Sequence, residues 1–441
     1  MKKDYSLAQN LLKEAISRSE AAEVVFSSGQ TRGVSFEHSK LKIVGAKYSV
    51  QVGLRLIKNG RIGVAATNNL DRTGDLVSKA LAVSEFGPAA LFEFPALTKY
   101  QEVKVFDPAV EKISEEKFVN LGQRIVDDFY KFNPNALVYV SFGWGEGRSA
   151  LLNSSGLEVE DMASNLDFSV WGELVEEGDI LWVGEGKTSC REDIDYDFCL
   201  ERVKRKFLQA KERVEIKTGY YPVVFTPRTF GDILSYIFTA LNGKMVVKGS
   251  SRLQNKLNQE VFDKRLTIVD DGLLNWKTGS GKIDDEGVAV KKLILIEKGI
   301  VRNFYYDLQS AAQAGVKSTG HGVRGSAAAL GSPGLHNVLI SGGKQTYASI
   351  LGDINEGILV EDFLGAGLNN PFNGDFSMNL SLGYKIEKGK VVGRVKDTMI
   401  AGNAFELLAH GIRAISKERE WVGGSFLSPY VVLEPVSVVS K

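Results

Sequence analysis

The spacing of apolar residues divides the chain into a first part that mixes helices with strands and a second part built mostly of strands. Leu7 and Leu11 begin a helical repeat that predicts an amphipathic helix at the start of the chain. Residues 22–68 then alternate between apolar and polar in several short runs broken by glycine, which predicts an antiparallel meander. Within the meander, Asn59 and Gly60 predict a hairpin, because both residue types accept the positive φ values of a two-residue turn.

Further helices and strands complete the first part. Apolar residues again recur at helical spacing over 71–84 and 114–131, which predicts two helices. A second set of strands is predicted over 136–183, followed by a basic helix over 193–211. These elements predict a first domain, residues 1–214, in which helices pack on a mainly antiparallel sheet.

The second part begins where the polar stretch at 212–219 gives way to the apolar sequence YYPVVF. We predict a second domain, residues 215–441, that is rich in sheet and has few helices, so the whole chain is predicted to be an α+β protein. Glycine turns at Gly299 and Gly389 predict two more hairpins like the first one. Near the end of the chain, a helix or helical turn and a closing strand are predicted at 400–415 and 428–435.

The best-marked helix of the second domain follows a short buried strand and has a signal at each end. Thr226 is a good N-cap, Pro227 fits the first helical position, and Gly243 suits the left-handed residue that ends a helix. Between these ends runs one apolar stripe at three- and four-residue spacing, made of Ile233, Leu234, Ile237, Phe238 and Leu241.

Composition limits the kind of partner that the chain can have. Its 441 residues are too many for one ordinary core. The 54 Lys and Arg residues balance 54 Asp and Glu residues, so no net field attracts nucleic acid or anionic lipid. No apolar run suits a membrane span or a signal peptide, and Cys190 and Cys199 fit neither a metal motif nor a disulfide framework. We therefore expect a cytoplasmic protein without a membrane partner.

Three local patterns favour structural roles over functional ones. The sequence GSGK at 279–282 lacks the flanking residues of a phosphate-binding loop, so a plain turn is favoured. The basic helix at 200–213 has its own apolar stripe, which favours a solvated charged face over nucleic-acid binding. The carboxylates at 270–271 and 284–286 precede glycine, and we interpret them as turns rather than as an acid/base pair or a cation site.

The chain has four histidines: His38, His321, His336 and His410. None lies four or five residues from another, so the sequence contains no local metal-binding pair. His321 stands out because it lies beside Arg324 in a loop rich in glycine and alanine, where backbone can approach a ligand closely. A solvated histidine and a binding role both stay open for this residue.

Several stretches of the second domain, taken together and in order, resemble the TldD/PmbA family, whose members are also called TldE or modulators of DNA gyrase. The matching stretches are Pro222–Leu241, Leu266–Gly272 (LTIVDDG), Asp284–Val301, Gly315–Arg324 (GVKSTGHGVR) and Asn373–Asn403. Each stretch alone is a weak signal, but the combination is specific. The first domain agrees with the family only in length and pattern.

In that family, the TldD branch is a zinc-type peptidase with an HExxxH motif on the helix that opens this domain and a cysteine ligand near the C-terminus. On this sequence, the positions of the histidine, glutamate and second histidine become Ser235, Tyr236 and Ala240. Serine and alanine cannot replace imidazole as zinc ligands, and no cysteine follows Cys199. The resemblance therefore implies the PmbA/TldE branch, with no catalytic residue, metal or cofactor in this chain and with zinc only in a TldD-type partner.

The resemblance also implies a role. It predicts the non-catalytic subunit of a TldD-type cytoplasmic metallopeptidase complex that degrades or processes peptides and small unfolded proteins. The subunit would pair with a TldD-type partner or with itself and hold peptide by strand addition, without membrane or nucleic acid. By family position, the candidate substrate-cleft residues are Asp285, Glu286, Thr319, Gly320, His321 and Arg324.

Two other functions stay open. The chain could be a self-standing peptidase whose ligands, such as His321 and Asp285, are brought together by folding. It could also be a module that binds a peptide or regulates another protein without catalysis.

Overall fold

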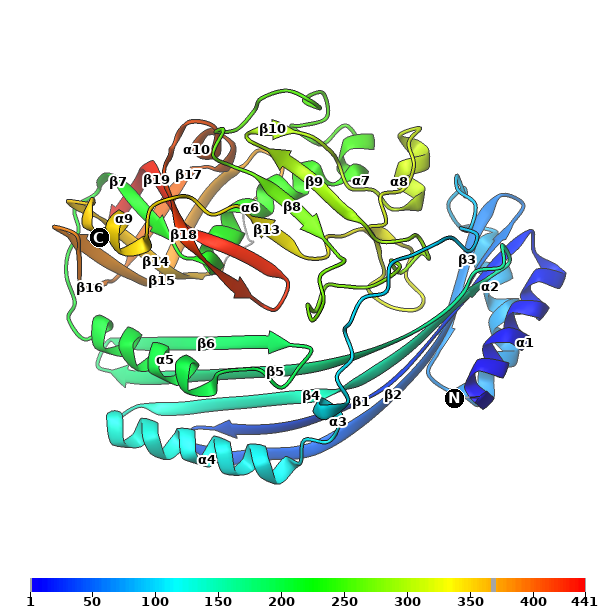
Figure 1. Cartoon of the computed structure of the whole chain (residues 1–441), viewed down its shortest axis with the longest axis horizontal. Coiled ribbons are helices and arrows are strands. Elements are labelled where there is room, and N and C mark those ends of the chain that lie inside the picture. The colour runs from blue at the N-terminus through cyan, green and yellow to red at the C-terminus, as the bar shows by residue number, and fades with distance from the viewer. Residues whose placement is uncertain (1, 366–369, 441) are drawn as a thin grey trace.

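The computed structural model describes residues 2–365 and 370–440, and most of their strands belong to two large sheets (Figure 1). The first sheet is antiparallel throughout, in the order β3-β2-β1-β4-β5-β6. Its strands are β1 (Ala21–Glu37), β2 (Lys40–Lys58), β3 (Arg61–Thr67), β4 (Leu137–Asn153), β5 (Glu158–Glu176) and β6 (Asp179–Ser189). The predicted meander and the second set of strands therefore join one sheet.

Helices pack on this sheet at both of its ends, while the second sheet lies over its concave side (Figure 1). The helices are α1 (Lys2–Arg18), the 3-10 helix η1 (Leu70–Asp75), α2 (Leu76–Ser84), α3 (Pro108–Glu111), α4 (Glu115–Phe132) and α5 (Tyr196–Ala210). At one end, Leu11 of α1 is buried in the same cluster as Leu54 of β2. At the other end, Phe118 of α4 stacks on Phe142 of β4, with ring centroids 4.5 Å apart. Each amphipathic helix thus buries its apolar stripe against one face of the sheet.

The glycines of the first sheet lie inside long strands, whereas the prediction for the meander was of short strands broken by glycine. Gly29 and Gly145 lie inside the long strands β1 and β4, which pair continuously. A Cβ atom on Gly145 would lie 1.9 Å from the carbonyl oxygen of Gln30, and one on Gly53 would lie 2.2 Å from that of Ala327. These glycines are needed because other backbone approaches them closely.

The second sheet has eleven strands, five of which pair in a closed ring. The pairing runs from β7 to β14, β15, β17 and β19, and β19 pairs again with β7. The strands are β7 (Gly219–Phe225), β8 (Ile268–Asp271), β9 (Lys292–Glu297), β10 (Ile300–Val301), β13 (Val338–Ile340), β14 (Glu356–Leu364), β15 (Asp375–Glu387), β16 (Lys390–Val395), β17 (Thr398–Asn403), β18 (Ile412–Val422) and β19 (Phe426–Ser440). A separate pair is formed by β11 (Gly322–Val323) and β12 (Ser332–Pro333).

The described helices of this part are few and mostly short, as predicted: α6 (Pro227–Leu241), α7 (Gly243–Val247), α8 (Leu308–Gln313), α9 (Tyr347–Gly352) and α10 (Ala404–His410). Thr226 caps α6 through its side chain, and the apolar stripe is buried in the largest core cluster. The prediction for Gly243 was wrong: α6 ends at Leu241 with Asn242 as its C-cap, and Gly243 begins α7 without a positive φ. Gly243 is needed because a Cβ atom there would lie 2.1 Å from the Tyr306 ring.

The three predicted hairpins are confirmed, since Gly60, Gly299 and Gly389 all have positive φ, as do the residues before them. The helix predicted at 400–415 is corrected. Only residues 404–410 are helical, and the apolar residues on either side of them belong to β17 and β18. A short apolar run flanked by glycine has no periodicity that separates a helix from a strand.

The two sheets share a core. Val224, Leu359 and Tyr384 of the second sheet are buried in one cluster with Phe129 and Phe207 of α4 and α5. α5 ends at Ala210 and β7 begins at Gly219. Because the predicted division at 214/215 lies between these two elements, we propose it as the domain boundary. None of the helices in the described ranges is both long and apolar enough to cross a membrane.

The charges of the basic helix are only partly solvated, which corrects the prediction. Arg202 and Lys206 of α5 are buried between the two sheets. Lys206 Nζ lies 3.3 Å from Oε2 of Glu185 and 3.0 Å from Oε2 of Glu361, and Arg202 pairs with Glu185 and Glu420. Burial tends to lower the pKa of Lys206, but the carboxylates of Glu361 and Glu185 outweigh burial and raise it.

Candidate functional site

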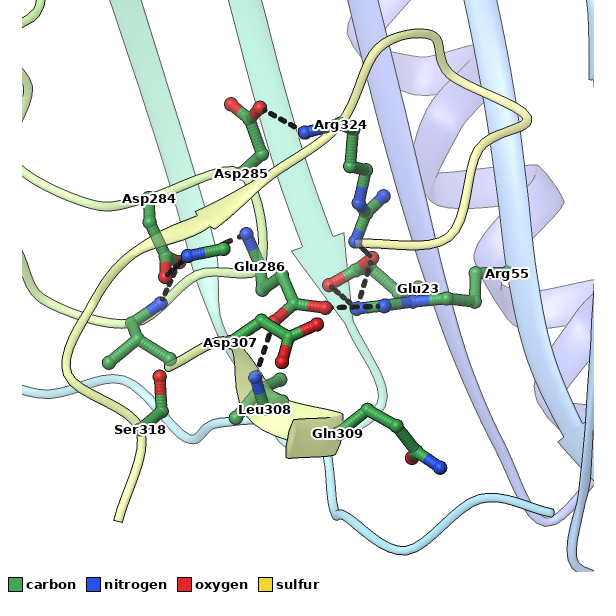
Figure 2. Close-up of polar contacts among 12 residues, drawn as sticks. Glu23, Arg55, Asp284, Asp285, Glu286, Asp307, Leu308, Gln309, Ser318 and Arg324 are labelled. Carbon is green, nitrogen blue, oxygen red and sulfur yellow. Dashed lines mark hydrogen bonds and ion pairs between the residues drawn. The ribbon is translucent and has the colours of Figure 1, made fainter. Parts of the chain in front are cut away.

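A buried ionic network joins the first sheet to loops of the second part of the chain at the candidate site (Figure 2). Glu23 of β1 and Arg55 of β2 lie opposite each other in register, with Arg55 Nη2 3.2 Å from Glu23 Oε1. Arg55 Nη1 lies 2.8 Å from Oε1 of Glu286, and Arg324 pairs with Glu23. The side chains of Glu23, Arg55 and Glu286 are 0%, 3% and 1% exposed. The network is therefore a set of charges removed from water.

Aromatic rings complete the site of Arg55. Its Cζ atom lies 5.1 Å from the ring centroid of Phe92 and 5.0 Å from that of Phe94. The second oxygen of Glu286 accepts a hydrogen bond from the backbone N–H of Leu308 at the start of α8, at 2.7 Å. Glu286 is thus held by a cation on one side and by a helix N-terminus on the other.

The two aspartates before Glu286 serve the loop that carries His321. Asp284 accepts hydrogen bonds from the backbone N–H groups of Glu286, Val288 and Gly322. Burial raises the pKa of Asp284 to about 8, and the charge of Glu286 also raises it. The three hydrogen bonds act in the opposite direction and lower the pKa. Asp285 accepts from the backbone N–H of Arg324 at 2.8 Å. The stretch 284–286 is a turn, as predicted, but Asp284 and Glu286 are buried, and only Asp285 is exposed (Figure 2).

The remaining candidates, Thr319, Gly320 and His321, lie elsewhere in the same loop. Thr319 Oγ1 accepts from the backbone N–H of Tyr306 at 2.7 Å, and Gly320 has a φ of +74°. His321 is completely buried, which excludes the solvated histidine, one of the two alternatives left open by the sequence. Its Nε2 lies 2.9 Å from Oδ2 of Asp270. Asp270 itself is a buried residue of β8 and not of a turn, which corrects the interpretation of 270–271.

The candidates therefore separate into two groups. Glu286 and Arg324 pair with residues of the first sheet, and Asp285 holds the backbone of Arg324. His321 meets Asp270 of β8, and Thr319 and Gly320 precede it in the loop. The carboxylate that His321 meets belongs to Asp270 and not to Asp285. Sequence reasoning missed Glu23, Arg55 and His336, and treated Asp270 as part of a turn. For Glu23 and Arg55, the available signal was a charged residue at an inward position of an otherwise apolar strand.

The family's motif positions on α6 offer no metal site. Ser235 is exposed, and its Oγ donates to the backbone carbonyl of Asp232 at 2.6 Å. Tyr236 is buried, with its ring 6.5 Å from that of Phe376, and Ala240 has only a methyl group. These three residues do not fit a zinc ion, which takes nitrogen, sulfur or carboxylate ligands.

Two adjoining cavities lie between the first sheet and the second part of the chain. The larger, about 970 Å³, is lined by residues of β1, β2, β4 and β5, by the segment 103–106, and by Trp276 and Lys282. The smaller, about 290 Å³, is lined in part by Asp285 and Arg324. Ser149, Ala150 and Asp161 line both cavities. We call the two together the cleft. It is large enough for several residues of an extended peptide.

Asp232, on α6, provides a pH-dependent test of the environment around the motif positions. Burial raises its pKa to about 6, although Arg228 lowers it. An unfolded aspartate titrates near 3.9, so the folded chain holds this proton more tightly. The contribution of Asp232 to stability is fully present below about pH 4 and is lost as the pH rises through about 6. Relative to wild type, Asp232→Asn should therefore gain about 1–2 kcal/mol in free energy of unfolding between pH 4 and pH 7.5.

Urea unfolding of both proteins at the two pH values measures this difference. Asp197→Asn, at an exposed aspartate that pairs with Arg124, is the control and should show no comparable change. A pH-independent difference between Asp232→Asn and wild type would mean that Asp232 binds its proton equally well in the folded and the unfolded chain.

Comparison with known proteins places the fold and the family. A family model described as the PmbA/TldA metallopeptidase C-terminal domain matches residues 218–440, and one described as PmbA/TldA metallopeptidase domain 1 matches residues 22–84. A Methanocaldococcus jannaschii protein, MJ0231, is 29% identical over 93% of this chain and 95% of its own length. A metalloprotease TldD homologue of Haemophilus influenzae is 26% identical over 88% and 83%.

A solved structure shares the fold. The crystal structure of TldE from Thermococcus kodakarensis superimposes with a TM-score of 0.90 at 24% identity, over 98% of this chain and 100% of that one. Because the C-terminal family model alone covers more than half of the 441 residues, this chain belongs to the PmbA/TldD metallopeptidase family.

Proposed function

We propose that this chain is the non-catalytic subunit of a TldD-type metallopeptidase complex and that its cleft holds peptide for the catalytic subunit. The main support for the proposal is that the side chains at the motif positions of α6 are not metal ligands. At the positions of the family's peptidase motif, the hydroxyl of Ser235 bonds to its own helix. Tyr236 is a buried phenol, and Ala240 has only a methyl group. The shared fold of a protein named TldE supports this assignment.

An exposed strand edge beside the cleft supports peptide binding. β3 pairs with β2 only over residues 52–58, so in the described part of the chain residues 40–51 of β2 pair with β1 alone. Leu41, Ile43, Val44 and Tyr48 on this edge are between 47% and 68% exposed. Tyr48 also lines the larger cavity. An extended peptide can therefore pair with the edge through its backbone and direct alternate side chains into the cleft.

The test is cleavage of an unstructured reporter peptide with zinc supplied, by this chain alone, by a TldD-type subunit alone, and by the mixture. We expect cleavage only in the mixture and its loss on adding a chelator. Ser149→Trp fills the cleft at an exposed position that both cavities share, and should slow cleavage by the mixture at least tenfold. Ser17→Trp, at an exposed position of α1, should leave the rate unchanged. Light scattering checks that both variants still assemble.

The other outcomes separate the alternatives. Chelator-sensitive cleavage by this chain alone would show that it is a self-standing peptidase. Full activity of the TldD-type subunit alone, together with saturable peptide binding by this chain, would show a binding module outside the complex. Equal cleavage rates for Ser149→Trp and Ser17→Trp in assembled mixtures would show that the cleft does not hold the peptide.

A further inference from the structure

Three potential metal ligands from separate parts of the chain meet in the second half of the molecule. Asp270 comes from β8, His321 from the loop that Asp284 fixes, and His336 from the residues just before β13. One ligand atom of each lies within 4.8 Å of the others. In the described part of the chain, no other group of three His, Cys, Asp or Glu side chains converges in this way. Asp270 and His321 are fully buried and His336 is partly buried.

Backbone carbonyls fix which nitrogen of each imidazole is left free for an ion. His321 Nδ1 lies 2.9 Å from the carbonyl oxygen of Thr319, and His336 Nε2 lies 2.7 Å from that of Gly320. A carbonyl oxygen only accepts hydrogen bonds, so both of these nitrogens carry the proton. In a neutral ring the other nitrogen, Nε2 of His321 or Nδ1 of His336, then has a free electron pair. Histidines that ligate metals are oriented in the same way by a second hydrogen bond.

The cluster therefore has an excess of acceptors in a buried place. Nε2 of His321 lies 2.9 Å from Oδ2 of Asp270, and two acceptors at this distance need a cation or a proton between them. The backbone N–H of His336 donates to Asp270, at 3.0 Å and 3.2 Å from its two oxygens, which positions the carboxylate without neutralising it. Among the described residues, no Lys or Arg side chain lies within 4.0 Å of Asp270.

We propose that Asp270, His321 and His336 bind a divalent first-row transition metal ion such as zinc. Two imidazoles and one carboxylate are a ligand set that such ions prefer, whereas calcium and magnesium prefer oxygen alone. The site is distinct from the motif positions on α6. Because Asp270 and His321 are fully buried, the ion has a structural role: it fastens the loop at 319–336 to β8. This inference does not depend on the proposed function.

The site can be tested with the metal alone. The full chain is stripped with a chelator, exchanged into metal-free buffer and titrated with Co²⁺, whose visible absorption reports nitrogen and oxygen ligands. We expect one equivalent to bind and Zn²⁺ to displace it. His336→Ala removes the most accessible ligand and should weaken binding by tenfold or more, as should Asp270→Asn. His410→Ala, at an exposed histidine of α10, is the matched control and should bind as wild type does.

Thermal unfolding gives a second readout for each variant. Zinc should raise the midpoint of wild type and of His410→Ala but not that of His336→Ala. If Asp270→Asn fails to fold, His336→Ala still decides, because His336 lies at the partly exposed side of the cluster. Failure of folded wild type to bind either ion at micromolar concentration would overturn the proposal and leave a proton shared between His321 and Asp270. Unchanged binding by His336→Ala would do the same.

Discussion

Replacing Arg55 by Met should lower the free energy of unfolding by about 3–5 kcal/mol, the usual cost of leaving a buried charge without its partner. Arg55 is the cation between Glu23 and Glu286, and Met keeps the volume between Phe92 and Phe94 while removing the charge. Both carboxylates are shielded from water, so neither can recover its solvation without local opening.

Urea unfolding followed by circular dichroism measures the loss. Arg18→Met is the matched control, because Arg18 pairs with Glu14 in a half-exposed pair on α1 and should contribute about 0.5 kcal/mol or less. Adding Glu286→Gln to Arg55→Met should recover part of the stability, since one uncompensated charge is removed. Equal losses for Arg55→Met and Arg18→Met would mean that water reaches the network.

Lys206→Met should also lower the free energy of unfolding by about 3–5 kcal/mol, because it removes the cation from a second group of charges. Lys206 lies between Glu185 of β6 and Glu361 of β14, whose side chains are each 12% exposed. Without Lys206, Glu361 loses this cation and repels Glu185 across the join between the sheets, although Glu185 keeps its pair with Arg202. Lys204→Met on the same helix is the control, because Lys204 pairs with Glu201, whose side chain is 68% exposed.

The measurement for Lys206 is again the free energy of unfolding, taken at pH 7. We expect the Lys204→Met value to stay within about 0.5 kcal/mol of wild type. If Lys206→Met proves as stable as wild type, the two carboxylates must share a proton or reach solvent once the ammonium group is gone. Glu361→Gln combined with Lys206→Met would then be indistinguishable from Lys206→Met alone.

The elements of the fold could be predicted where a local signal decides the structure. Period-two alternation and the Asn-Gly turn placed the first sheet, and Thr226 and Pro227 placed the start of α6. The end of α6 was misjudged because glycine has two uses: Gly243 serves close packing against Tyr306 rather than a left-handed turn. The same ambiguity made the strand glycines look like breaks.

The candidate site could be predicted only in part. Family position identified Glu286 and His321, but their partners Arg55 and Asp270 lie far from them in the sequence. The four histidines were judged by local spacing, which cannot reveal that two of them meet through a loop. Whether a charge on a helix faces water or another sheet, as for Lys206, also depends on tertiary packing that no periodicity encodes.

The ionic network and the shared core have a consequence for how the molecule unfolds. Glu23 and Arg55 belong to one sheet, and Glu286 and Arg324 belong to the part of the chain that carries the other. Neither part can separate from the other without exposing unpaired charge and apolar surface at the same time. The two parts should therefore melt in a single cooperative transition. Added salt should shift that transition little, because mobile ions do not screen charges that water does not reach.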